Sequence, residues 1–411
     1  MFSPAEEPIA ITGMGVVSPV GCSLDEFWSG VRAGESAAAP IDEFDLSRHR
    51  VRFGCRVRGF TGCDFLSSKE ARRLDPFATY GVAAAWSAFE DAGSPRPDPT
   101  RAAVITGNAV GGRLTSDNET RNYVELGPPR VHPLMPLMTM PNAVAALVAI
   151  QLRWRGPALS IATVCASGGD AVGAAVQLLR SDRADVVLAG GCESTLTPVT
   201  LAAFANLNAL STRNDEPARA SRPFDVDRDG FVMGEGAGFL VLERLGDARA
   251  RGARIYAAVA GYAATADAHH LAMPPEDGAG AAECMKAAIA DGGLSPDDIV
   301  HVNAHGTSTP YNDRAEAAAL RAVFAGAVPP VTATKGVIGH LIGAAGAVEL
   351  IATVLAMRAG SVPPTANHER TDPDLGIDVV HGSSRDVPVG PALSNSFGFG
   401  GHNACLVVTP V

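Results

Sequence analysis

A chain of 411 residues, of which 46% are hydrophobic and 6% aromatic, is neither disordered nor a minimal domain. Its 44 glycines predict tightly packed α/β layers, because small residues let helices approach sheets. The length fits two or three average domains, or one large unit built from two similar halves. A formal net charge of -11 disfavours nucleic acid as the main partner, since a phosphate backbone requires a basic surface.

The cysteines predict a reducing compartment and no metal site. There are seven, an odd number, without a CxxC pair or the spacing of metal ligands. The first residues lack the basic start and apolar run of a signal peptide, and no apolar segment reaches membrane-spanning length without a charge or a glycine. We therefore expect a cytoplasmic protein with no membrane partner.

Short β-rich runs alternate with longer alanine-rich stretches along the first part of the chain. We expect helices at 68–92 and 168–180, and strands at 8–17, 102–106, 158–163 and 185–189. A second set follows, with strands at 239–243, 255–262, 299–303 and 405–409 and helices at 280–291, 314–324 and 340–359. This alternation is typical of an α/β protein with buried sheets.

A polar stretch at 245–254 separates the two sets of elements. We therefore expect an N-terminal half, 1–250, and a C-terminal half, 251–411. No internal repeat is visible at the residue level, so composition and pattern alone do not establish a duplicated fold.

Cys165 directly follows an expected strand, and small residues follow it in VCASGG, at 164–169. This pattern indicates a sharp strand-to-helix turn with the sulfur at a helix N-terminus, where the dipole and free amides favour the thiolate. A buried, inert cysteine is the better interpretation of any single cysteine, including the other six. The glycine pair after Cys165 and two later histidines indicate a nucleophile instead.

Two histidines complete a set with this cysteine. His305 lies in NAHGTSTP (303–310) after an expected strand, and His340 ends KGVIGH (335–340) before an expected long helix. A histidine at a helix N-terminus is biased toward the neutral form and can donate a hydrogen bond to a forming oxyanion. Either histidine alone, like the other eight, is better interpreted as a capping or core residue. Together the three suit carbon–carbon bond formation on a thioester better than hydrolysis, because nothing in the set is placed to activate water.

Two charged residues accompany His340. Lys335 stands in a glycine-flanked loop, and Glu349 is a lone acid in an apolar part of the expected helix. A surface lysine is the ordinary interpretation of Lys335, but a buried acid needs a partner. We expect Lys335 and Glu349 to pair as supporting residues of the site.

Near the C-terminus, NSFGFGG (395–401) precedes the last expected strand. Glycines around an aromatic residue permit close backbone approach to a ligand and a swinging side chain, as a gate requires. Phe399 and Gly400 are therefore candidate substrate-binding residues, although a plain glycine-rich turn fits the motif equally well.

Four segments resemble those of the β-ketoacyl-acyl carrier protein synthases, the elongating ketosynthases of fatty-acid and polyketide assembly. They are VCASG (164–168), NAHGTSTP (303–310), KGVIGHLIGAAG (335–346) and NSFGFGG (395–401). The similarity extends from IAITGMG (9–15) through SRPFD (221–225) and GFVMGEG (230–236) to the last strand. It implies a thiolase fold, in which two pseudo-equivalent halves stack as α-β-α-β-α layers, usually in dimers.

The resemblance also implies roles for the site residues. Cys165 would accept an acyl chain, and the backbone amides of Cys165 and Phe399 would form the oxyanion hole, with Phe399 as the gate. His305 and His340 would assist the decarboxylation of malonyl-acyl carrier protein and hold the enolate oxygen. Thr307 and Thr309 match positions that bind the phosphopantetheine arm, which carries the substrates without any further cofactor.

An acyl carrier protein is the partner that the resemblance implies. Lys69, Arg72, Arg73 and Arg213 match basic docking positions of the family, and an acidic carrier needs such a patch. A solvated charged surface is the ordinary alternative.

The sequence indicates the branch of the family less directly than the family itself. Histidine at 340 favours elongation over initiation, and Cys165 argues against an inactive chain-length factor. The segments 170–173, 312–316 and 362–367 resemble catalytic subunits of type II polyketide synthases, whereas 268–278 and 303–310 resemble the second fatty-acid ketosynthase type. The favoured interpretation is a type II polyketide ketosynthase that makes a reduced or polyene chain beside a chain-length factor. The alternative is a homodimeric fatty-acid ketosynthase.

Two further possibilities remain open, a cysteine hydrolase and a non-catalytic dimer partner. A hydrolase would not need Lys335, a second histidine or a gate, and a silent partner would not need Cys165. Two departures from the family pattern, Val164 and Ala166, flank the sulfur and bear on the preferred acyl chain.

Overall fold

The computed structural model describes residues 7–60, 65–325 and 327–411. The first part of the chain forms β1 (Ile9–Val17), α1 (Leu24–Ala33), β2 (Ala39–Pro40), β3 (Phe53–Gly54), α2 (Ser68–Ala71), α3 (Pro76–Asp91), β4 (Ala102–Gly107), α4 (Arg113–Leu126), α5 (Met135–Thr139), α6 (Ala143–Leu152), β5 (Ala158–Ile161), α7 (Ser167–Arg180), β6 (Val186–Glu193), α8 (Pro198–Asn206), β7 (Gly236–Arg244) and α9 (Leu245–Ala250). The second part forms β8 (Ala257–Ala266), α10 (Ala279–Asp291), β9 (His301–Asn303), α11 (Pro310–Phe324), β10 (Val331–Thr332), α12 (Lys335–Ile338), α13 (Ala345–Ala359), β11 (Ser361–Val362), β12 (Arg385–Asp386), β13 (Ala392–Gly398) and β14 (His402–Thr409).

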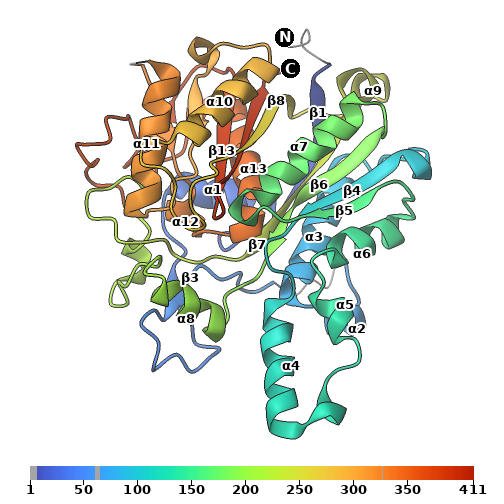
Figure 1. The fold of residues 1–411 in the computed structure, drawn as a ribbon. Helices are drawn as coiled ribbons and strands as arrows, with labels where there is room; N and C mark the ends of the chain where they lie inside the picture. Colours follow the sequence, from blue (N-terminus) through green and yellow to red (C-terminus); the bar gives the residue numbers. More distant parts are fainter. Residues whose placement is uncertain (1–6, 61–64, 326) are drawn as a thin grey trace.

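The two halves have the same strand order. The main sheet of the described residues runs β10-β9-β13-β14-β8-β1-β7-β6-β4-β5. If the five strands of each half are numbered along the chain, the order from the outer edge is 3-2-4-5-1 in both. The halves join where β1 pairs with β8 through Ile9, Ala10 and Ile11. β8 therefore lies between β1 and β14, the first and the last strand of the described residues (Figure 1).

Helices fill the space between the two halves of the main sheet and cover the outer face of each half. α7 and α13 contact each other and strands of both halves, so they form the central layer. α3 and α6 pack on the outer face of the first half, and α10 packs on that of the second with α11 against it (Figure 1). The result is the expected five-layered α-β-α-β-α arrangement.

Side chains alternate along each strand between the hydrophobic cluster of the central layer and the cluster under the outer helices. In β6, Val187 and Ala189 belong to the central hydrophobic cluster with α7 and α13, whereas Val186 and Leu188 face α3 and α6. In β14, Leu406 likewise faces the central layer, while its neighbours in sequence belong to the cluster under α10 and α11. Strands buried on both faces explain the continuous apolar runs in the sequence.

Several element boundaries differ from the sequence predictions. The strand expected at 239–243 is part of β7, which pairs with β1 and β6 in the first half, not with the second set. The helix expected at 68–92 is interrupted, because Asp75 caps α3 and Pro76 occupies its first position. The helix expected from residue 340 begins at Ala345. The boundary between halves at residue 250 stays a prediction.

One apolar stretch, Ile342–Ala359, is long enough to cross a membrane by length and composition, but 83% of it is buried inside the protein, as in a core helix. Six cysteines of the described part of the chain are free thiols, and the seventh, Cys63, lies outside the described residues.

Candidate active site

Cys165 stands at a strained turn between β5 and α7. The turn, Val164–Ala166, is a short 3-10 helix that leads directly into α7. Val164 has a φ of 54°, a left-handed conformation that is costly for a β-branched side chain. The predicted strand-to-helix turn is therefore present, with the cysteine held in a conformation that the surrounding structure must stabilise.

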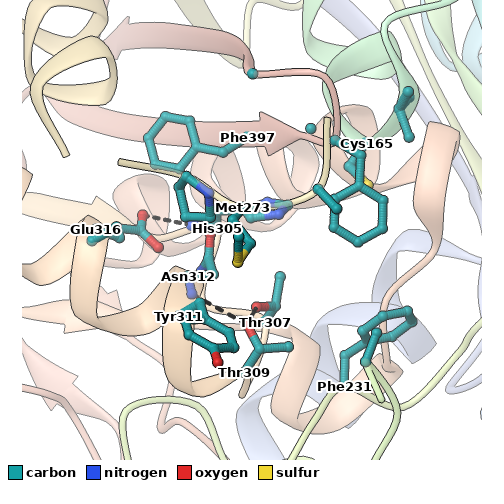
Figure 2. A pocket seen from close by; sticks show the side chains of 18 of the residues that line it. Cys165, Phe231, Met273, His305, Thr307, Thr309, Tyr311, Asn312, Glu316 and Phe397 are labelled. Atoms are coloured by element: carbon teal, nitrogen blue, oxygen red, sulfur yellow. Dashed lines mark hydrogen bonds between the residues drawn. The ribbon is translucent and has the colours of Figure 1, made fainter. Parts of the chain in front are cut away.

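Cys165 lies in a cavity of about 570 Å³ together with His305 and His340. Figure 2 shows Cys165 and His305 directed toward the same space, with Thr307 and Thr309 further along it. Aromatic and aliphatic side chains make up much of the wall near the sulfur: Phe204, Phe231, Ile342, Phe397 and Phe399.

His340 contacts the nucleophile directly. Its Nε2 atom lies 3.1 Å from Sγ of Cys165. Its Nδ1 atom accepts the backbone N–H of Ile342 at 3.2 Å, which leaves the ring proton of the neutral form on Nε2. Burial, with the charge of Lys335, holds the pKa of His340 well below its usual value. The imidazole is therefore neutral and presents an N–H to the cavity; burial, not the helix N-terminus, is the main cause.

His305 has the same tautomer for a similar reason. Nζ of Lys335 lies 3.2 Å from its Nδ1 atom. An ammonium group only donates, so Nδ1 is the acceptor and the proton is on Nε2. Burial, Lys335 and His340 lower the pKa of His305 well below its usual value. The two rings lie edge to face, with centroids 5.3 Å apart.

Lys335 and Glu349 form the contact that the sequence predicted. Nζ of Lys335 lies 2.5 Å from Oε1 of Glu349, and both side chains are 1% exposed. Burial raises the pKa of Glu349 to about 7, and the charge of Lys335 opposes this shift. The lysine thereby fixes His305 while its own charge is offset by a buried acid.

The expected thiolate at Cys165 is not the favoured form in this buried position. Burial raises the pKa of the thiol from 9.0 to about 12, although Lys335 and the backbone amide of Phe399 oppose it. A helix N-terminus stabilises an anion by about 1 kcal/mol, which is less than one pKa unit. Burial is the larger effect, so the resting group is a neutral thiol.

The family is decided by sequence comparison over nearly the whole chain. The profile of the β-ketoacyl synthase N-terminal domain matches residues 6–248, and that of the C-terminal domain matches 256–369. The chain belongs to the β-ketoacyl synthases. It is 42% identical to 3-oxoacyl-[acyl-carrier-protein] synthase 2 of Synechocystis sp. over 99% of both chains. It is 39% identical to the chloroplastic synthase I of Hordeum vulgare, over 98% of this chain and 89% of that one.

Solved structures of ketosynthases have the same fold. One, described as the ishigamide ketosynthase/chain length factor, superposes with a TM-score of 0.93 at 35% identity, over 99% of this chain and 100% of that one. A type II polyketide ketosynthase in complex with its acyl carrier protein superposes with a TM-score of 0.89 at 31% identity, over 99% of this chain and 100% of that one. A β-ketoacyl synthase of Burkholderia phymatum superposes with a TM-score of 0.91 at 32% identity, over 98% of this chain and 100% of that one. This synthase therefore has the thiolase fold and is a condensing acyltransferase. Members of the family use no cofactor, and their substrates are carried on acyl carrier protein.

In this synthase the end of β13 packs tightly against the nucleophile. A Cβ atom added to Gly398 would lie 2.7 Å from the carbonyl oxygen of Thr163 and 3.2 Å from the amide nitrogen of Cys165. Glycine is therefore required at 398, and the following residue, Phe399, brings its amide to the sulfur. Gly400 has a φ of 86° and donates its N–H to the carbonyl of Leu271 at 2.7 Å. This contact ties the candidate gate to a segment whose His270, Ala272 and Met273 line the cavity.

Thr307 and Thr309 lie side by side in the cavity that contains the sulfur. Their hydroxyl oxygens are 2.9 Å apart, and both residues line the cavity (Figure 2). Thr309 also caps α11 by accepting the N–H of Asn312. The pair therefore offers two neighbouring hydroxyls to a polar ligand in the channel.

Sequence reasoning missed Glu316, a buried acid in α11. Its two carboxylate oxygens accept the backbone N–H groups of His305 and Gly306, each at 2.8 Å, and Oε1 also accepts the amide of Asn395 at 3.2 Å. Glu316 thus holds the loop that carries His305. It stands among alanines, three residues after Asp313 in α11, a setting similar to the apolar surroundings that drew attention to Glu349.

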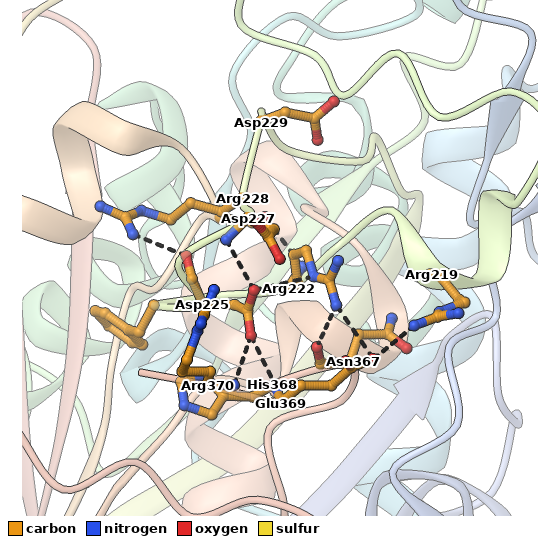
Figure 3. A network of polar contacts seen from close by, with 12 residues as sticks. Arg219, Arg222, Asp225, Asp227, Arg228, Asp229, Asn367, His368, Glu369 and Arg370 are labelled. Atoms are coloured by element: carbon orange, nitrogen blue, oxygen red, sulfur yellow. Dashed lines mark hydrogen bonds and ion pairs between the residues drawn. The ribbon is translucent and has the colours of Figure 1, made fainter. Parts of the chain in front are cut away.

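A second polar network joins residues 219–229 to residues 367–370 (Figure 3) and contacts the same loop at Ser308. Arg222 donates its backbone N–H to Oγ of Ser308, and its side chain lies 3.4 Å from Asp225. Oδ2 of Asp225 accepts the backbone N–H groups of Glu369 and Arg370, each at 2.9 Å. The SRPFD motif, which supported the resemblance without a role, therefore links the His305 loop to the segment near 370.

The candidate docking residues do not form one group. Lys69 in α2 and Arg72 and Arg73 just after it are all exposed. Arg213 is half-buried, and its guanidinium donates to the carbonyl of Asp227 at 2.8 Å. The first three are free to meet a partner, whereas Arg213 is engaged within its own loop.

Proposed function

We propose that this synthase elongates a Cys165-bound acyl chain by decarboxylative condensation with malonyl-acyl carrier protein, in the manner of a fatty-acid ketosynthase. The observation that carries the proposal is the pair of neutral histidines, both with their Nε2 protons toward the cavity that contains the thiol. Two N–H donors at one point stabilise an oxyanion, whereas proton abstraction from water requires a free basic nitrogen.

In the first step, Sγ of Cys165 attacks the carbonyl carbon of an acyl thioester. The amides of Cys165 and Phe399 stabilise the oxyanion of the tetrahedral intermediate. The bond to the phosphopantetheine sulfur breaks, and the proton of the cysteine thiol ends on that leaving sulfur. The hydroxyls of Thr307 and Thr309 hold the pantetheine arm during the transfer.

In the second step, malonyl-acyl carrier protein loses carbon dioxide, and Nε2–H of His305 and of His340 stabilise the enolate oxygen. The ring centroid of Phe397 lies 5.8 Å from that of His305, and the ring centroid of Phe231 lies 5.3 Å from that of His340. The departing carboxylate therefore has apolar surroundings, which favour neutral carbon dioxide. The carbanion attacks the carbonyl carbon of the acyl-cysteine, a carbon–carbon bond forms, the bond between that carbon and Sγ breaks, and the released thiolate takes a proton from solvent. Lys335 and Glu349 keep His305 oriented.

The curated relatives support fatty-acid elongation over the polyketide role favoured on sequence grounds. Proteins named 3-oxoacyl-[acyl-carrier-protein] synthase 2 match at 42% identity, against 35% and 31% for the polyketide-type structures. The TM-score of 0.93 with the ishigamide ketosynthase/chain length factor keeps a type II polyketide role as the second candidate. Acyl carrier protein is the partner in either case, and the location of the enzyme would be the cytoplasm.

A reconstituted assay separates the two candidates. The protein purified alone is incubated with acyl- and malonyl-acyl carrier protein, and the products are identified by mass spectrometry. A fatty-acid enzyme, acting with a second copy as its dimer partner, gives one extension of a saturated acyl chain without any other subunit. A requirement for a co-expressed chain-length factor would favour the polyketide role, and the absence of an acyl adduct at Cys165 would refute both.

A further inference from the structure

Asp170, one helical turn into α7, accepts hydrogen bonds from two hydroxyl groups that come from different parts of the fold. Oδ2 accepts the hydroxyl of Thr163 at 2.5 Å, and Oδ1 accepts the hydroxyl of Tyr262 at 2.8 Å. The residue is 7% exposed. Both carboxylate oxygens are thus used in a buried bridge from the residue before the strained turn to a strand of the second half.

Thr163, the first of the two residues bonded to Asp170, precedes the turn that carries the nucleophile. It directly precedes Val164, whose left-handed conformation stores strain. Its backbone N–H donates to Oγ of Ser167 at 2.9 Å, and its carbonyl accepts the N–H of Ala166 at 3.1 Å. Its carbonyl is also the atom that would lie 2.7 Å from a Cβ on Gly398. A shift of Thr163 therefore moves both the sulfur and the oxyanion-hole strand.

Tyr262 is the second residue bonded to Asp170, and its ring packs against a glycine of α7. A Cβ atom added to Gly173 in α7 would lie 2.2 Å from the tyrosine ring. The backbone N–H of Tyr262 donates to Asp291 at 2.9 Å, and Asp291 also accepts Arg180 at the end of α7 at 2.8 Å. α7 is thereby tied to β8 near both of its ends, and Asp170 transmits the anchoring of β8 to the turn.

We infer that Asp170 is a positioning residue for acyl transfer. Through its hydrogen bonds to Thr163 and Tyr262 it holds the Val164–Ala166 turn, so that the sulfur and the Cys165 amide keep the positions that attack on the thioester requires. The inference rests on the proposed role of Cys165 as nucleophile. The bridge connects the turn to β8, and neither of its two hydrogen-bond partners belongs to the loops that carry His305 and His340. It therefore governs the steps at the sulfur and leaves decarboxylation to His305 and His340.

Two variants remove one hydroxyl each with little change in shape, Thr163→Val and Tyr262→Phe. Tyr256→Phe is the matched control, because Tyr256 stands just before the same strand and donates its hydroxyl to another aspartate, Asp91, at 3.0 Å. Three quantities are measured: the single-turnover rate of acyl transfer to Cys165, the malonyl decarboxylation rate of enzyme alkylated at Cys165, and the melting temperature.

We expect Thr163→Val and Tyr262→Phe to slow acyl transfer by about tenfold or more, since a misplacement of about 1 Å costs about a hundredfold. Decarboxylation by the alkylated enzyme should stay within about twofold of wild type, and Tyr256→Phe should change neither rate. Thr163→Ser, which restores a hydroxyl, should recover most of the acyl transfer rate.

Acyl transfer at the wild-type rate in both folded variants would overturn the inference, and so would equal losses in acyl transfer and decarboxylation, which indicate a general structural role. If one variant does not fold, the other decides. Failure of the underlying function is distinguishable, because wild-type protein would then show no adduct at Cys165.

Discussion

Nε2 of His340 lies 3.1 Å from Sγ of Cys165, although 175 residues separate them in the chain. Its other nitrogen is occupied by the backbone N–H of Ile342, so the proton that faces the sulfur is fixed by the main chain and not by pH. The histidine is therefore a permanent donor at the reacting centre. Its removal should affect the step that creates an oxyanion from malonyl, not the step that loads the cysteine.

His340→Ala should leave the acyl adduct at Cys165 and abolish most malonyl decarboxylation. Loss of one oxyanion donor costs about a hundred- to a thousandfold in rate. Mass spectrometry detects the adduct, and release of labelled carbon dioxide measures decarboxylation. Decarboxylation at the wild-type rate would contradict the assigned role.

The reactivity of Cys165 should rise steeply with pH. Its pKa is raised to about 12 by burial, so over the range from pH 7 to pH 9 the thiolate is a minor form that increases about tenfold per unit. The rate of alkylation by iodoacetamide should rise in the same proportion. A rate that levels off below pH 8 would mean that the helix N-terminus and Lys335 outweigh burial.

Glu316→Gln should weaken both the fold and the decarboxylation step. The new amide group would face a backbone N–H of His305 or Gly306, and an unsatisfied buried donor costs about 1–3 kcal/mol. The denaturant midpoint and the decarboxylation rate should both fall. Glu283→Gln, on an exposed part of α10, is the control and should leave both unchanged.

Charge reversal of Arg72 and Arg73 should raise KM for carrier-bound substrates by about tenfold, because basic rim residues steer an acidic partner. Small acyl thioesters, which need no docking, should be used as before. Lys286→Glu is the control, since this exposed lysine lies on α10, far from α2 in the molecule (Figure 1). Equal effects on both kinds of substrate would remove these arginines from the docking surface.

The sequence predicted Cys165 and the two histidines, with Lys335 and Glu349 as their supporting residues, because each of them stands in a short local pattern. Cys165 follows a strand and precedes small residues, and Lys335 and Glu349 are charges that apolar surroundings force together. The five-layered fold followed from the resemblance, since alternation of strands and helices alone fits many α/β folds.

Other features depend on contacts that no local pattern contains. The neutral thiol results from burial under segments that lie far along the chain, so the helix N-terminus alone predicted the wrong form. β7 follows the first set of elements in sequence, but its place between β1 and β6 is a property of the sheet. Asp170 was visible only as part of a motif, because its two partners are fixed by tertiary structure.

The position of β8 between β1 and β14 has a consequence for synthesis of the protein. In a chain that emerges from the ribosome, Cys165 is translated well before His305 and His340, and the main sheet of the described residues is incomplete until β14 has left the exit tunnel. Condensation is then impossible for an unfinished chain.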